Sequence, residues 1–149
     1  MEKNQDKIFL KKYLYKDVFK WIEDNKSKKK LAIWGTGAEA KTFLELVSYE
    51  FDFFIETNPR TRYFLGKKVF DPKILKQYLP NELNIIICSE FINEIDPLLK
   101  LNNFKLEENY IHINKTKLKS IKMYAKDKND HNKIVQLMNI NSNYVRLIN

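Results

Sequence analysis

Two of the three glycines in this chain of 149 residues lie in one short stretch, residues 31–41 (LAIWGTGAEAK). Gly35, Gly37 and Ala40 give this stretch the pattern G-x-G-x-x-A. In such a turn the first glycine allows a sharp passage from strand to helix. The second lets the backbone approach a phosphate, and the small third residue lets helix and strand pack closely. Because the amides at the start of the following helix would hold the anion, the spacing predicts a phosphate-binding turn.

An acidic residue follows this turn at the distance expected for a ribose-binding carboxylate. Glu56 lies 21 residues after Gly35, close to the usual offset of about 20 residues. The alternative is a solvent-exposed residue that closes a strand. Arg60 and Arg62 could meet a phosphate or could lie on a surface loop. Glu39 disfavours a tightly bound pyrophosphate, although an acid in the first turn also favours the helix itself.

A further candidate follows the apolar segment 84–88 (NIIIC). Ligands of open α/β sheets bind at the carboxyl ends of the strands, so Ser89 is either a ligand contact or a cap of the next helix. We expect Cys88 to face the core and His112 to be a strand residue rather than a base. Because no pair of nucleophile and base emerges, catalytic residues stay unassigned. The candidate ligand contacts are Gly35, Thr36, Gly37, Ala38, Glu39, Glu56, Asn58, Arg60 and Ser89.

The elements that position these residues alternate between strands and helices. Short apolar runs predict strands at 31–34, 51–56, 67–70, 84–89 and 110–113. Apolar residues at helical spacing predict helices at 7–24, 38–49 and 91–101. Strands joined by such helices form right-handed crossovers. The predicted fold is therefore α/β, a small doubly wound parallel sheet of about five strands, with an N-terminal helix and a helical C-terminal tail.

Proline and asparagine mark the helix ends. Asp71 and Pro72 predict the start of a short helix that Pro80 ends. Pro97 lies inside the helix at 91–101, so either the helix kinks there or its regular part begins at Asp96. Asn103 stands where a residue in the left-handed conformation would end that helix.

Composition excludes several classes of protein. Hydrophobic residues make up 44% of the chain and charged residues 31%, which is typical of a soluble globular protein. One cysteine, with His112 and His131 as the two histidines, argues against a disulfide framework and a metal site. No apolar run reaches the roughly 18–20 residues of a membrane span, and the N-terminus lacks the apolar core of a signal peptide. We therefore expect a cytoplasmic protein.

The net charge of +8 is concentrated in the C-terminal tail. Residues 1–113 carry 19 Lys/Arg and 17 Asp/Glu, whereas residues 114–149 carry 8 and 2, so the tail contributes +6. The tail predicts two short helices, one with Leu118, Ile121 and Ala125, the other with Ile134, Leu137 and Met138. Its lysines, at positions 115, 117, 119, 122, 126 and 128, could track a phosphate backbone. We prefer the solvated face of a surface helix and expect no nucleic-acid partner.

Five segments together resemble a known small Rossmann-like domain: 33–41 (IWGTGAEAK), 53–59 (FFIETNP), 66–69 (GKKV), 85–89 (IIICS) and 109–111 (NYI). The chain is similar over about residues 28–113 to the N-terminal nucleotide-sugar-binding domain of bacterial sugar O- and N-acyltransferases. It is also similar to a related domain at the C-terminus of sugar C-methyltransferases.

The resemblance implies that Gly35, Thr36 and Gly37 face the phosphates or sugar of a ligand, and that Glu56 stands for the usual Asp near the base or ribose. Two features of these enzymes are missing. No hexapeptide repeat follows residue 113, and one cysteine cannot form the cysteine-rich zinc motif of the methyltransferases.

We thus expect three segments: an N-terminal amphipathic helix with a basic connector at 1–30, a Rossmann-like nucleotide-binding domain at 31–113, and a basic helical extension at 114–149. The expected function is binding of a nucleotide or a nucleotide sugar in sugar or cell-surface glycan metabolism, without a complete catalytic site; the cofactor is not specified, and NAD(P) or a nucleotide sugar would fit. A catalytic partner chain or a homo-oligomer would then supply the chemistry. Two alternatives stay open: a small NAD(P)-dependent or nucleotide-sugar-modifying enzyme, and a non-catalytic protein-interaction module.

Overall fold

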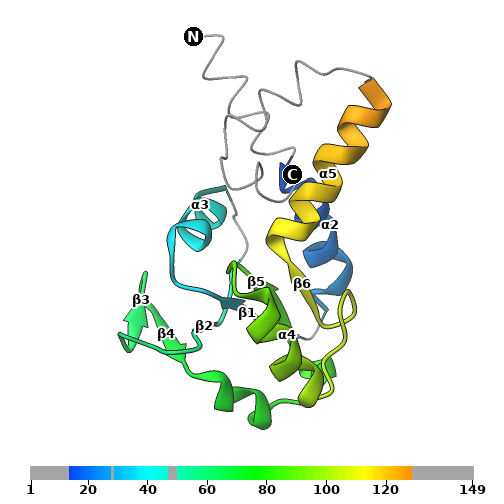
Figure 1. The fold of residues 1–149 in the computed structure, drawn as a ribbon. Coiled ribbons are helices and arrows are strands. Elements are labelled where there is room, and N and C mark those ends of the chain that lie inside the picture. Colours follow the sequence, from blue (N-terminus) through cyan, green and yellow to red (C-terminus); the bar gives the residue numbers. More distant parts are fainter. Residues whose placement is uncertain (1–13, 28, 47–49, 129–149) are drawn as a thin grey trace. The chain divides into compact units, whose positions relative to one another are not determined.

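The computed structural model describes residues 14–27, 29–46 and 50–128 (Figure 1). The chain divides into two compact units. One is Ile22–Ile113, and the other combines Met1–Trp21 with Asn114–Asn149. Each unit is described below by itself. Among the described residues, no helix has the length and apolar character needed to cross a membrane.

The unit Ile22–Ile113 contains a sheet to which the described residues contribute six strands, in the order β3-β4-β2-β1-β5-β6 (Figure 1). The strands are β1 (Lys30–Trp34), β2 (Phe53–Ile55), β3 (Tyr63–Phe64), β4 (Lys67–Phe70), β5 (Leu83–Ile87) and β6 (Tyr110–His112). Every pair of neighbours is parallel except β3 and β4. The five parallel strands confirm the five predicted ones to within two residues at each end.

The sixth strand, β3, is a correction to the predicted count of about five. It lies between the strands predicted at 51–56 and 67–70 and pairs antiparallel with β4. Leu65 and Gly66 join the two strands with φ of 48° and 79°, as a two-residue hairpin turn requires. A strand of two residues shows no alternation of apolar and polar side chains, so the sequence pattern could not reveal it.

The connections follow from the strand order. The chain passes from β1 to β2 through α3 (Ala38–Leu46), and from β5 to β6 through α4 (Ile92–Leu101). These two crossovers run in opposite directions across the sheet, so right-handed connections place α3 and α4 on opposite faces. Between β4 and β5 lie two short 3₁₀ helices, η1 (Pro72–Gln77) and η2 (Pro80–Glu82). The arrangement is compatible with the predicted doubly wound fold.

Both faces of the central strands are buried. Ala32 and Trp34 of β1 and Ile85 and Ile87 of β5 belong to a cluster that also contains residues of α4 and η1. Their neighbours Ile33 and Ile86 point to the other face, because side chains alternate along a strand, and they are also fully buried. This explains why both strands are continuous apolar runs rather than alternating ones.

The helix ends confirm some predictions and correct others. Asp71 caps η1 by accepting a hydrogen bond from the Lys73 amide at 2.7 Å, as predicted, but η1 ends at Gln77 and Pro80 begins η2 instead of ending the helix. The start of α4 at Ile92, with Pro97 inside, rules out a regular helix that begins at Asp96. Asn103 has a φ of 67°, which confirms its predicted left-handed conformation.

Two predicted helices extend beyond the described residues. The N-terminal helix is described as α2 (Lys16–Asn25), and residues 7–13 of the prediction lie outside the described chain. Similarly, residues 47–49 of the predicted helix at 38–49 lie outside it. The tail forms one helix of 16 residues, α5 (Ile113–Lys128), instead of a short one. The second helix predicted there, around Ile134, lies outside the described residues.

One lysine of the tail does not lie on a solvated face. Lys117 is buried, and its ammonium group donates a hydrogen bond of 3.2 Å to the Tyr15 hydroxyl and lies 4.7 Å from the centre of the Tyr15 ring. Next to this pair, the Ser120 hydroxyl donates to Asp17 at 2.9 Å. Lys117 therefore packs inside the unit formed by the two ends of the chain, where it joins α5 to Tyr15.

Candidate functional site

The register of the sheet brings the carboxyl ends of three strands to one edge. Trp34, the last residue of β1, pairs with Ile55 of β2 and with Ile87 of β5. The residues that follow these three strands, Gly35, Glu56 and Cys88, therefore lie at the same carboxyl edge. The strand order changes direction between β1 and β5, and such a switch point is where open α/β sheets bind ligands.

Gly35 is required by the packing of the sheet itself. Its φ is 125°, and a Cβ atom built on it would lie 2.3 Å from the carbonyl oxygen of Cys88. The Gly35 amide donates to the Ile55 carbonyl at 2.9 Å, and the Cys88 amide donates to the Trp34 carbonyl at 2.8 Å. The turn thus passes directly against the end of β5, where no side chain fits.

The packing of the sheet does not require a glycine at position 37. Its φ lies outside the left-handed region, its surface is exposed, and no atom lies within 4 Å of a Cβ built on it. Its carbonyl accepts the first backbone hydrogen bond of α3, from Lys41 at 3.2 Å. The described residues give no packing reason for a glycine here, and the backbone is open to an approaching group.

Glu56 contacts the turn directly. Its Oε2 accepts hydrogen bonds from the amide of Thr36 at 3.0 Å and from the hydroxyl of Thr36 at 2.8 Å. Its Oε1 accepts one from the amide of Thr57 at 3.2 Å. Both Glu56 and Thr36 are half-buried. A carboxylate has about four acceptor positions, so Glu56 keeps one of them, on Oε1, for a further donor.

Apart from Ser89, the other predicted ligand contacts lie at the start of α3 or in the segment after β2. Ala38 and Glu39 form the start of α3, with Ala38 exposed and Glu39 half-buried. Asn58 and Arg60 lie in the exposed segment after β2, as does Arg62. The structure therefore joins Thr36 and Glu56 by hydrogen bonds, whereas the described residues show no hydrogen bond or ion pair between the turn and Asn58 or Arg60.

Ser89 and Cys88 follow β5. The Ser89 hydroxyl accepts a hydrogen bond from the amide of Phe91 at 3.1 Å, just before α4 begins at Ile92. This contact favours the predicted alternative, in which Ser89 stabilises the start of the next helix. Cys88 is buried, as predicted.

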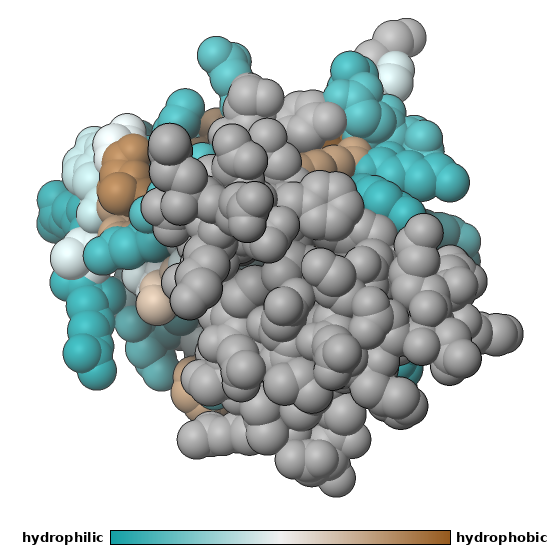
Figure 2. Space-filling model, turned by 90° about the horizontal axis from the view of Figure 1, so that it is seen from above, coloured by the Kyte–Doolittle hydropathy of each residue, from teal (hydrophilic) through white to brown (hydrophobic). Residues whose placement is uncertain are grey.

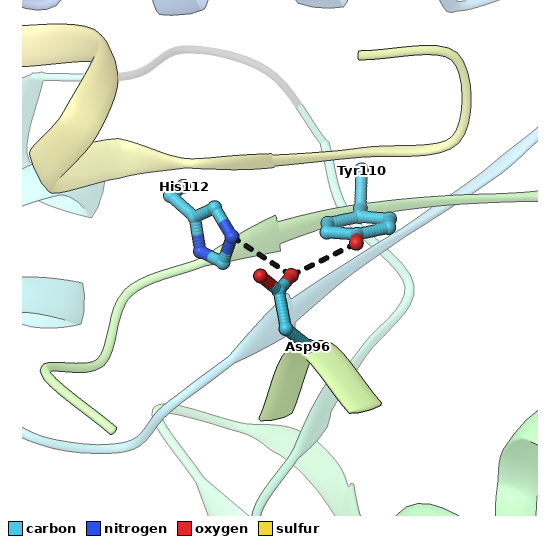
Figure 3. Close-up of polar contacts among 3 residues, drawn as sticks. All are labelled: Asp96, Tyr110 and His112. Atoms are coloured by element: carbon cyan, nitrogen blue, oxygen red, sulfur yellow. Dashed lines mark hydrogen bonds and ion pairs between the residues drawn. The ribbon is translucent and has the colours of Figure 1, made fainter. Parts of the chain in front are cut away.

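A polar cluster at the end of β6 was not predicted (Figure 3). One carboxylate oxygen of Asp96 accepts the Tyr110 hydroxyl at 2.8 Å and lies 3.0 Å from Nε2 of His112. Tyr110 and His112 alternate along β6, so both side chains face α4, where Asp96 stands. That spacing was visible in the sequence, but nothing in it indicated that Asp96 would face the two rings.

Burial and hydrogen bonding shift the proton affinities in this cluster. Burial alone would raise the pKa of Asp96, but the Tyr110 hydrogen bond and His112 outweigh it, so the pKa lies below the usual 3.8. Burial and the Asp96 carboxylate raise the pKa of Tyr110 well above its usual 10. Only 1% of the His112 side chain is exposed. The cluster therefore joins α4 to β6 inside the unit, as a structural contact.

No group of three or more His, Cys, Asp and Glu side chains within the described ranges could hold a metal ion. A comparison with models of known protein families finds no match, and a comparison with curated proteins finds no significant match either. The interpretation of the site therefore rests on its geometry.

Proposed function

We propose that this chain binds a nucleotide or a nucleotide sugar at the carboxyl edge between β1 and β5, as a Rossmann-like domain does, and serves sugar or cell-surface glycan metabolism. The observation that carries the proposal is Gly37. Glycine loses more conformational freedom on folding than any other residue, and the described residues do not require one at position 37, directly before α3. A ligand phosphate that approaches the backbone supplies the missing reason.

Strand order supports the same proposal. Numbered along the chain without β3, the parallel strands lie in the order 3-2-1-4-5, which is the order of the Rossmann fold. The turn between β1 and α3 then occupies the position at which that fold holds a phosphate. An α-helix leaves its first amides without partners inside the helix, so the start of α3 adds donors for an anion.

Glu56 supports a ligand that carries hydroxyl groups. Its carboxylate already accepts three hydrogen bonds from Thr36 and Thr57, which hold it at the edge of the turn. The acceptor position left on Oε1 suits a ribose hydroxyl. NAD(P) and nucleotide sugars share the ribose and phosphate groups that this arrangement would bind.

The proposed role is binding without a complete catalytic site. Cys88 is buried, the Ser89 hydroxyl already accepts the Phe91 amide, and His112, the one histidine among the described residues, is buried against Asp96. None of the three is placed to attack or deprotonate a ligand at the turn. A catalytic partner chain or a second copy of this chain would supply the reaction.

The proposal is tested by thermal unfolding of the full chain with NAD(H), NADP(H), UDP-sugars, CMP-sugars and S-adenosylmethionine. A ligand at 100 times its dissociation constant stabilises the folded state by about 2.7 kcal/mol. For a chain of this size, the melting temperature should rise by about 5–10 °C. If none of these ligands raises it, the proposal is wrong.

A pair of variants then locates the site. Gly37→Leu should fold, since Gly37 is exposed and a Cβ built on it meets no atom within 4 Å, yet it should lose the ligand-induced shift. The control is Asn81→Leu, an exposed position in η2 just before β5, at the opposite edge of the sheet. A Gly37→Leu variant that binds as well as the wild type would exclude the turn as the site.

A further inference from the structure

The edge of the sheet next to β3 carries an unusual distribution of charge. We call residues 57–70 the edge hairpin; it contains β3, β4 and the segment that leads to them. It has four cations, Arg60, Arg62, Lys67 and Lys68, and no Asp or Glu. All four side chains belong to exposed residues. The rest of the chain up to residue 113 has 15 cations against 17 acids, so the positive charge is local to this hairpin.

The edge hairpin is anchored on one side only. The Phe64 ring packs edge-on against Phe54 of β2, with ring centres 5.0 Å apart, and Lys41 of α3 lies 5.6 Å from the centre of the Phe64 ring. Tyr63 and Lys68 pair across the two strands and therefore share the face opposite to Phe64. The contacts of Phe64 hold the hairpin, and the outer face is left to solvent.

Two large apolar residues are exposed on this hairpin. Tyr63 is 60% exposed, and Leu65, at the tip, is 57% exposed. On the face seen in Figure 2, most of the described surface is hydrophilic and hydrophobic residues form only small areas. Figure 1 shows β3 and β4 at the outer edge of the sheet, away from β6. The apolar tip and its basic neighbours are thus presented together at one extremity of the sheet.

We propose that the edge hairpin is a contact site for an anionic membrane surface. Arg60, Arg62 and Lys68 would bind the phosphate and carboxylate groups of acidic phospholipids, and Leu65 and Tyr63 would enter the boundary between headgroups and acyl chains. Lys67 pairs with Phe64 and lies 5.6 Å from the centre of the Phe51 ring, on the other face. Tyrosine suits that boundary because its ring is apolar and its hydroxyl is polar. Neither the basic residues nor the apolar residues would bind a membrane strongly by themselves. Together, a few apolar side chains and a basic cluster give reversible binding. This inference is independent of the proposed nucleotide site.

Other occupants fit less well. A second copy of this chain that paired along β3 would bring the four cations of one hairpin close to the four cations of the other, and like charges that are close together repel. A single-stranded nucleic acid binds by stacking its bases on aromatic side chains. Of the two aromatic residues in β3, Tyr63 is exposed and Phe64 packs on Phe54. An exposed leucine at the tip is no stacking surface, but it suits an acyl boundary.

The test is sedimentation of the full chain with vesicles of phosphatidylcholine, alone or mixed with phosphatidylserine. The wild type should bind only the mixed vesicles, and added salt should weaken binding. Each basic residue near such a surface changes affinity about fivefold, so Arg60→Glu with Arg62→Glu should reduce binding at least twentyfold. Leu65→Ser with Tyr63→Ser should reduce it about tenfold at unchanged net charge.

Matched controls separate the hairpin from the basic tail. Lys73→Glu with Lys76→Glu makes the same change in net charge on η1, where both lysines are exposed. Leu101→Ser removes a residue that is 80% exposed on α4. Both controls should bind at least five times more tightly than the matching hairpin variants. Melting curves should show that all variants fold; if the glutamate variant does not, Arg60→Gln with Arg62→Gln takes its place.

Three results would overturn the inference. The wild type could fail to bind the mixed vesicles, or the hairpin variants could bind as well as their controls. The hairpin variants could also lose binding to single-stranded DNA while vesicle binding stays unchanged, in which case the hairpin is a nucleic-acid contact.

Discussion

The two glycines of the turn should respond very differently to alanine. In Gly35→Ala the new Cβ would lie 2.3 Å from the Cys88 carbonyl oxygen, at a φ of 125° that residues with side chains rarely adopt. The backbone conformation alone costs about 1–3 kcal/mol. If β5 shifts to relieve the contact, the 2.8 Å hydrogen bond from Cys88 to Trp34 weakens, which adds about 1 kcal/mol. We therefore expect a loss of about 2–4 kcal/mol.

Gly37→Ala has neither cost. Its φ is ordinary and its surroundings are open, so we expect a change of less than about 1 kcal/mol, in the range of surface substitutions. Chemical denaturation of both variants with the wild type measures the difference in unfolding free energy. Since domains are stable by about 5–15 kcal/mol, both variants should remain measurable. If Gly35→Ala unfolds within 1 kcal/mol of the wild type, the close approach of the turn to β5 is wrong.

Two further predictions concern buried and half-buried polar contacts. Thr36→Val and Glu56→Gln should be non-additive, with a coupling energy of about 0.5–1.5 kcal/mol in a denaturation cycle, because they share one hydrogen-bonded carboxylate oxygen; additive effects would mean that the contact contributes nothing. Asp96→Asn should cost about 2 kcal/mol at pH 7, since Asp96 accepts the Tyr110 hydroxyl and lies beside His112. The folded-state pKa of Asp96 is lowered, so the stability that it contributes is present above pH 3.8 and is lost as the pH falls through its folded pKa. The difference between Asp96→Asn and the wild type should therefore narrow below about pH 4 in urea titrations, and a difference that stays constant would contradict this assignment.

The central strands were predictable because burial on both faces leaves a direct trace in the sequence. In β5 all five residues are buried, which produces the apolar run in 83–87, and β1 shows the same pattern in its last three residues. The predicted left-handed Asn103 follows from a local rule about how helices end. In each case the local sequence contains the physical reason for the local structure.

The parts that were missed depend on contacts between distant residues. Tyr110 and His112 could be placed on one face of a strand, but their partner Asp96 comes from a preceding helix whose rotation the sequence does not specify. The sequence around Lys117 does not distinguish it from the exposed lysines of the tail. Its contact with Tyr15, 102 residues away, is formed only in the folded chain. Such partners are set by tertiary packing, which outweighs local preference.

The position of the turn was predictable from local sequence, but the contact between Thr36 and Glu56 was not. That contact determines where each part of a ligand can bind. Thr36 and Glu56 were each predicted to face a ligand, yet they bind each other. A fixed carboxylate about 5 Å from a phosphate would oppose it by about 3 kcal/mol at an effective dielectric constant of 20. A phosphate is therefore disfavoured beside Thr36 and favoured farther along, over Gly37 and the first amides of α3. A hydroxyl group beside Glu56 meets no such repulsion and finds a free acceptor. In the proposed complex the ribose thus lies at Glu56 and the phosphate at Gly37, so substitutions at the two positions probe opposite ends of one ligand.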